Sequence, residues 1–125
     1  MIVGIGVDAV DIDRFRTVLQ RTPSMRDRVF THEELAYAEQ SSDAVPSLAV
    51  RFAAREAVMK ALGVGLGAFG FHDVFVRRDE SGRPTLVVGG AAAELARERA
   101  GLDAEHGQLE EAWLEVSEQL EQLAL

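Results

Sequence analysis

The sequence contains no cysteine, which excludes disulfide bonds and thiolate metal sites. It also has no apolar run approaching the ~20 residues that span a bilayer, and its N-terminus lacks the basic start of a signal peptide. We therefore expect a cytoplasmic protein that does not contact membranes. A chain of 125 residues is expected to form one domain, residues 1–125, with a hydrophobic core of its own.

Basic residues are too few to balance the acidic ones, and the formal net charge is −8. This acidity argues against nucleic-acid binding. The charge is uneven, because residues 94–125 hold nine acids and two arginines whereas the rest of the chain is close to neutral. Five arginines lie between positions 14 and 28. Such a cluster forms either a solvated helix face or a surface that attracts an acidic partner.

Lysine occurs once, at Lys60, whereas all other basic side chains except histidine are arginines. Lysine carries a compact charge on a flexible stem, and arginine carries a broad planar fork. A single lysine is therefore consistent with a phosphate oxygen in a narrow pocket. The alternative is an ordinary surface pair between Glu56 and Lys60, worth about 0.2–0.5 kcal/mol on a helix.

The pattern of apolar residues, caps and turns predicts an α+β fold, a small sheet with a long buried central helix. Asp11 and the Thr31–Glu34 capping box mark two helix starts, and Gly63 marks the end of the long helix. The predicted elements are a strand at 2–10, helices at 11–20, 31–40 and 46–62, a hairpin of 71–78 and 84–88, a helix at 91–100, a strand at 112–116 and an acidic helix at 117–125.

The predicted helix at 46–62 has apolar residues around nearly its whole circumference. Two pairs of charged residues interrupt them, Arg51 with Arg55 and Glu56 with Lys60. Burying an unpaired ion costs several kcal/mol, so these charges require partners. For Glu56 and Lys60, a metal ion together with a polyanionic ligand would satisfy both signs of charge.

Asp8 is a second carboxylate of interest, because it follows two glycines in an otherwise apolar run. Taken alone, it fits an aspartate at a strand end that accepts local backbone hydrogen bonds. Taken with Glu56, it suggests a magnesium site, because Mg²⁺ uses few protein ligands and completes its shell with water and substrate phosphates. Two carboxylates beside Lys60 are typical of a centre for phosphoryl transfer.

Five segments of the chain, in this order, resemble the holo-acyl-carrier-protein synthases, the small bacterial members of the phosphopantetheinyl transferase superfamily. The resemblance covers roughly residues 1–90. The segments are GIGVD at 4–8, FTHEEL at 30–35, RFAAREAVMKALG at 51–63, FHDV at 71–74 and GRP at 82–84.

The resemblance implies a reaction in which a serine of acyl carrier protein attacks the β-phosphate of coenzyme A. Phosphopantetheine moves to the serine, and adenosine bisphosphate leaves. The catalytic residues implied are Asp8 and Glu56, which would hold Mg²⁺, and Lys60, which would contact the coenzyme A phosphates. The general base is either Glu56 or a metal-bound water.

The resemblance also implies further contacts with both substrates. Arg51 and the glycines Gly63, Gly65 and Gly67 would lie along the nucleotide, and Arg14 would dock the acidic carrier protein. Family members are usually homotrimers with active sites between the protomers.

Residues 105–125 depart from the family pattern, because the histidine and the apolar last strand expected after Trp113 are absent. This departure keeps a second hypothesis open, a degenerate homologue that binds carrier protein or coenzyme A without catalysis. A third hypothesis is an unrelated magnesium-dependent nucleotide hydrolase, which would need no acceptor protein.

Overall fold

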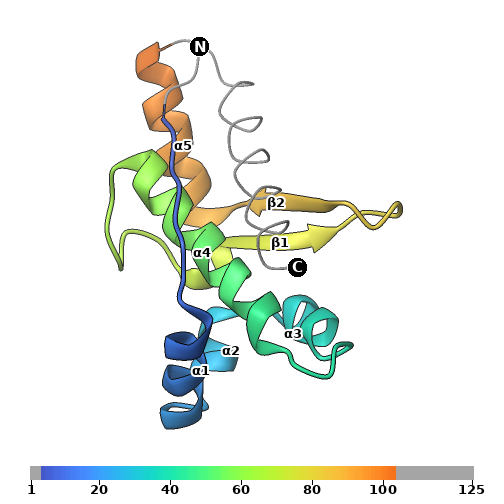
Figure 1. Ribbon diagram of the computed structural model, residues 1–125. Helices are drawn as coiled ribbons and strands as arrows, with labels where there is room; N and C mark the ends of the chain where they lie inside the picture. Colours follow the sequence, from blue (N-terminus) through green and yellow to red (C-terminus); the bar gives the residue numbers. More distant parts are fainter. Residues whose placement is uncertain (1–3, 104–125) are drawn as a thin grey trace.

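The computed structural model describes residues 4–103 and confirms an α+β fold built around one long helix, α4 (Figure 1). No helix in this part of the chain has both the length and the apolar character needed to cross a bilayer. The elements are α1 (Ile12–Arg21), α2 (Met25–Val29), α3 (His32–Ala38), α4 (Val45–Leu62), the 3₁₀ turn η1 (Phe71–Asp73), β1 (Val74–Arg78), β2 (Pro84–Val88) and α5 (Gly90–Asp103).

The predicted helix boundaries arise from local hydrogen bonds. The Asp11 side chain accepts from the Arg14 amide at 3.0 Å, which caps α1. The capping box is complete, since Thr31 Oγ1 accepts from the Glu34 amide and Glu34 Oε1 accepts from the Thr31 amide. Gly63 ends α4 in the left-handed conformation, at φ 68°.

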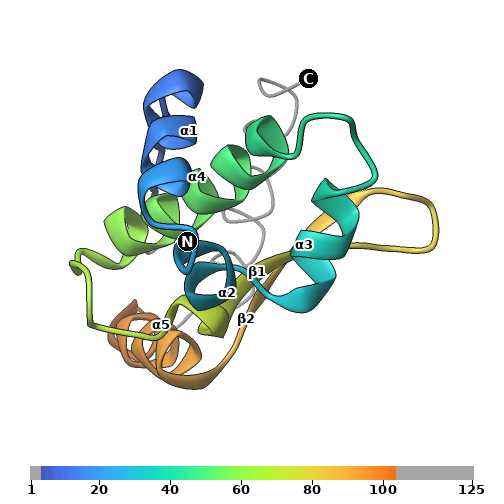
Figure 2. The same cartoon turned by 90° about the horizontal axis from the view of Figure 1, so that it is seen from below.

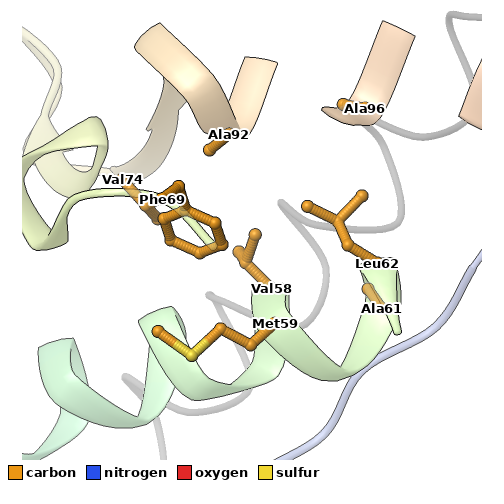
Figure 3. Close-up of a cluster of buried hydrophobic side chains, with 8 residues drawn as sticks. All are labelled: Val58, Met59, Ala61, Leu62, Phe69, Val74, Ala92 and Ala96. Atoms are coloured by element: carbon orange, nitrogen blue, oxygen red, sulfur yellow. The ribbon is translucent and has the colours of Figure 1, made fainter. Parts of the chain in front are cut away.

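Helix α4 is the common wall of two hydrophobic clusters. Figure 2 shows α1 beside α4 and α5 at the opposite end of the molecule, with the hairpin β1–β2 between α3 and α5. One cluster joins the first half of α4 to α1, α2 and α3 through Phe15, Leu19, Val29, Phe30, Ala38, Val45, Leu48 and Ala49. The other joins its second half to β1 and α5 through Val58, Met59, Ala61, Leu62, Phe69, Val74, Ala92 and Ala96 (Figure 3). Burial on both sides explains why α4 lacks a polar stripe.

The sheet of the described residues is one antiparallel hairpin, as predicted. β1 pairs with β2 from Val74–Val88 to Arg78–Pro84. Asp79 Oδ1 accepts from the amides of Ser81 and Arg83, so it closes the turn between the strands.

Several predicted elements differ from the structure. Residues 4–10 are extended but form no strand, because no ladder pairs them in the part of the chain that is described. The first three residues of the predicted strand at 71–78 form η1 instead, α3 ends at Ala38, and α5 continues past Gly101. The short helix α2 was not predicted, because a five-residue helix offers too few positions for a periodic pattern. The predicted strand at 112–116 and helix at 117–125 lie outside the described residues.

A buried ion pair between Glu34 and Arg55 locks α4 to α3 and β1. Arg55 Nη2 and Nη1 donate to the two Glu34 carboxylate oxygens at 2.6 and 3.0 Å, and both side chains have no exposed surface. The Val76 amide also donates to Glu34, and Arg55 Nε donates to the Phe71 carbonyl. One of the charged residues on α4 therefore has an internal partner, as the cost of burying an ion requires.

We expect Arg55→Met to lower the free energy of unfolding by about 3–5 kcal/mol, because the Glu34 carboxylate would remain buried without its counter-ion. Arg77→Met is the matched control, since Arg77 pairs with Glu33 where both side chains are half-exposed. The control should cost less than about 1 kcal/mol. Urea denaturation followed by circular dichroism measures both, and equal losses would contradict a special role for the buried pair.

Candidate functional site

The extended N-terminal segment lies directly on the backbone of α4 (Figure 1). A Cβ atom on Gly4 would collide with the Ala61 carbonyl, and a Cβ atom on Gly6 would collide with the Ala57 carbonyl. Glycine is therefore the residue that permits this close approach. The two glycines of this segment therefore permit a close backbone contact with a helix, and the segment is not a strand.

This approach brings Asp8 to the last turns of α4, where Lys60 binds it. Lys60 Nζ lies 2.8 Å from Asp8 Oδ1 and also donates to the Val7 carbonyl at 3.1 Å. The Asp8 side chain is 17% exposed, and the Lys60 side chain is 55% exposed. The pair therefore sits at the surface with the carboxylate on its inner side.

Glu56 lies one helical turn before Lys60 and is half-buried. Burial raises the pKa of the Glu56 carboxyl above its usual value, the negative charge of Asp8 raises it further, and Lys60 partly offsets both effects. Two carboxylates and one ammonium thus act on one another, and the negative charges outnumber the positive one.

This set of side chains fits a magnesium ion. Asp8 and Glu56 would supply hard oxygen ligands, one from the N-terminal segment and one from α4, and a cation would relieve their mutual repulsion. Within residues 4–103, no three acidic or histidine side chains gather into a metal site. A cation bound by Asp8 and Glu56 would therefore depend on water and phosphate oxygens for its remaining ligands, as Mg²⁺ usually does.

A glycine-rich loop begins at Gly63, where α4 ends. The Gly63 amide donates to the Lys60 carbonyl, and Gly65 and Gly67 are exposed, with no atom within 4 Å of a Cβ placed on either. This open backbone could be approached closely by a ligand. Arg99 of α5 fixes the start of the loop, because its Nη1 donates to the Leu62 carbonyl at 3.0 Å. Nothing in the sequence indicated this contact, which joins residues 37 positions apart.

Comparison with known proteins identifies the family. The model of the 4'-phosphopantetheinyl transferase superfamily matches residues 4–115. The chain belongs to this superfamily. The resemblance to its holo-acyl-carrier-protein synthases is confirmed by individual relatives of that name.

Individual synthases match most of the chain. The holo-[acyl-carrier-protein] synthase of Moorella thermoacetica is 44% identical over 93 residues, which are 74% of this chain and 73% of that protein. The synthase from Neisseria meningitidis, known from a crystal structure, is 35% identical in sequence to this chain. The two structures match with a TM-score of 0.69, over 80% of this chain and 82% of the other. The Bacillus anthracis synthase in complex with CoA (3',5'-ADP) is 35% identical with a TM-score of 0.63, over 72% of this chain and 78% of the other.

The structure does not bring Arg51 to the other candidate site residues. Arg51 precedes Lys60 by nine positions, about 13 Å along the helix axis. Its side chain is buried, donates to Ser47 and lies 4.7 Å from the Tyr37 ring centroid. A contact between Arg51 and a nucleotide stays a prediction, and the geometry within one chain does not favour it.

Arg14 is exposed on α1, as a docking residue must be. Its neighbour Arg16 is engaged within the chain, because its two Nη atoms donate to the two Asp43 carboxylate oxygens at 2.9 and 2.6 Å. A surface hollow of about 530 Å³ lies between α1 and the loop at 39–45, and Arg16 and Arg26 are among its lining residues. The hollow could not be predicted, because it forms between segments that are distant in sequence.

We expect Gly6→Ala to lower the free energy of unfolding by about 1–3 kcal/mol, because the new methyl group would push the N-terminal segment away from the Ala57 carbonyl. It should also separate Asp8 from Lys60. Gly65→Ala is the matched control, since a Cβ atom there meets nothing within 4 Å. Chemical denaturation measures the stability of both variants. If the two glycines tolerate alanine equally well, the close approach of the segment to α4 is wrong.

Proposed function

We propose that this chain transfers the phosphopantetheine group of coenzyme A to a serine of acyl carrier protein in a magnesium-dependent reaction that releases adenosine bisphosphate. The observation that carries the proposal is the meeting of Asp8, Glu56 and Lys60 in a member of the phosphopantetheinyl transferase superfamily. The names of the related synthases and the coenzyme A complex of one of them support the same substrates.

In the proposed reaction, the serine oxygen forms a bond to the β-phosphorus of coenzyme A, and the bond from that phosphorus to the bridging oxygen of the pyrophosphate breaks. Asp8 and Glu56 would hold Mg²⁺, which supplies positive charge to the pyrophosphate when bound. Lys60 stabilises the negative charge on the leaving side. The proton of the serine hydroxyl would pass to a general base, for which Glu56 and a water molecule at the metal ion are the two candidates.

The attacking hydroxyl belongs to the carrier protein, so the site needs a docking surface for an acidic partner. Arg14 on α1 is exposed, whereas Arg16 is paired with Asp43. We assign the docking contact to Arg14, because it matches the basic position on the first helix that the family resemblance implies for docking, and its exposure is consistent with that role. Electrostatic complementarity of this kind mainly speeds encounter and fixes orientation.

A homotrimer remains part of the proposal. Ile5 and Val7 leave 65% and 61% of their surface exposed along the extended segment that carries Asp8. Burial of these apolar side chains between protomers would favour association. The mass of the protein in solution by light scattering decides this point, and a monomer at micromolar concentration would contradict it.

We expect the wild-type protein to convert apo carrier protein to its phosphopantetheine form in the presence of coenzyme A and Mg²⁺, measured as a mass increase of the carrier. Loss of a residue that only hydrogen-bonds to a metal ligand costs roughly 10–100-fold in activity. Asp8→Asn and Glu56→Gln each change a proposed ligand itself, so each should slow transfer by more than that.

Glu94→Gln is the matched control for these variants, because Glu94 is an exposed carboxylate on α5. It should behave like the wild type. Transfer by the Asp8 and Glu56 variants at the wild-type rate would refute the site. Coenzyme A binding without any transfer would instead identify a degenerate homologue, and nucleotide hydrolysis without an acceptor would identify a hydrolase.

We expect Arg14→Glu to raise the KM for carrier protein by about three- to ten-fold, because it places a negative charge where an acidic partner docks. The affinity for coenzyme A, measured by calorimetry, should not change. Arg97→Glu on α5 makes the same change of charge at another exposed position and should leave both values unchanged. An equal rise in KM for the two variants would show a general effect of net charge.

A further inference from the structure

Lys60 has two tasks that compete for one ammonium group. In the structure it holds Asp8 Oδ1 and the Val7 carbonyl, which takes two of its three donors. In the proposed reaction the same group contacts the phosphates of coenzyme A, and Asp8 is a ligand of the metal ion. A divalent cation bound to Asp8 would repel the ammonium of Lys60, so both requirements are best met if Lys60 leaves Asp8 when the metal ion binds.

We propose that Lys60 is a replaceable counter-ion, which holds Asp8 while no divalent cation is bound and moves to the phosphates of coenzyme A when a cation takes its place. This inference rests on the proposed function. It makes binding of the cation and binding of coenzyme A cooperative, because each favours the position of Lys60 that the other needs.

The charges at the site support this exchange. The cation-free site holds the carboxylates of Asp8 and Glu56 and only one ammonium, so Lys60 reduces their repulsion without cancelling it. A divalent cation on Asp8 brings twice the positive charge to the same carboxylate and repels the ammonium. Because the Lys60 side chain is 55% exposed, its pair with Asp8 is of the kind that contributes about 0–1 kcal/mol, so little opposes its release.

The choice of lysine fits the same role. Arg16 and Arg55 each bind both oxygens of a carboxylate with two Nη donors, Arg16 on Asp43 and Arg55 on Glu34. Lys60 binds Asp8 through one oxygen on a flexible stem. A two-pronged guanidinium would hold Asp8 more firmly and exchange less readily. Easy exchange is therefore a physical reason for the one lysine in a chain that otherwise uses arginine.

The exchange predicts opposite effects for two substitutions of Lys60. Lys60→Met should raise the affinity for Mn²⁺ in the absence of coenzyme A, because nothing competes for Asp8. Lys60→Arg keeps the charge but should lower that affinity, because a guanidinium grips Asp8 with two bonds. Mn²⁺ replaces Mg²⁺ as the probe, and the electron paramagnetic resonance signal of the unbound ion gives the affinity directly.

Coenzyme A supplies the second measurement. It should tighten Mn²⁺ binding to the wild-type protein by up to about five-fold more than it tightens binding to Lys60→Met, because release of a partly exposed ion pair makes at most about 1 kcal/mol available. Arg77→Met is the matched control, because Arg77 is an exposed cation paired with a carboxylate on the hairpin. It should match the wild type in both measurements. Circular dichroism verifies that each variant is folded.

The possible outcomes separate this inference from the proposed function. If the wild type transfers phosphopantetheine but Lys60→Arg binds Mn²⁺ as tightly as the wild type, the exchange is wrong and the enzyme assignment stands. Unchanged or weaker Mn²⁺ binding by Lys60→Met also overturns the exchange, as does transfer with no detectable metal binding. If the wild type transfers nothing to carrier protein, the proposed function itself fails.

Discussion

The contact between two glycines and the backbone of α4 is the constraint on which the candidate site depends. Gly4 and Gly6 lie against the carbonyls of Ala61 and Ala57, and any side chain at either position would hold the segment away from the helix. Because of this contact, Asp8 reaches Lys60 across 52 positions of sequence. The metal-binding and phosphate-binding groups of the proposed reaction are thus brought together by the absence of two side chains.

The charged residues of α4 serve different purposes according to the direction in which they point. Arg55 points inward and joins α3 and β1 to the helix through Glu34, whereas its neighbour Glu56 is half-buried beside Asp8. The inward pair is fully enclosed and holds the helix in place, which in turn fixes the direction of Glu56. The ion pair between Lys60 and Asp8 at the end of α4 remains partly exposed, as the proposed exchange of Lys60 requires.

The predictions that succeeded relied on local rules. Asp11, the Thr31–Glu34 capping box and Gly63 determine helix ends through hydrogen bonds within a few residues, so sequence was sufficient to place them. Residues 4–10 of the expected strand form no strand in the described part of the chain, because an extended, apolar segment can satisfy either a sheet or the surface of a helix. Arg51 was assigned to the nucleotide from the resemblance alone, and that contact stays a prediction. Its burial beside Tyr37 depends on packing that no motif encodes.

The sequence by itself determined the α+β class, the long central helix and the family, because these follow from periodicity, caps and a specific order of motifs. It also supplied Asp8, Glu56 and Lys60 as the residues of the proposed site. Only the tertiary structure decided which charges meet. It paired Arg55 with Glu34 and Lys60 with Asp8, although Glu56 lies at the helical spacing for a pair with Lys60. The physical reason is that charge pairing depends on distance and burial in space, and both arise from the packing of segments that are far apart along the chain.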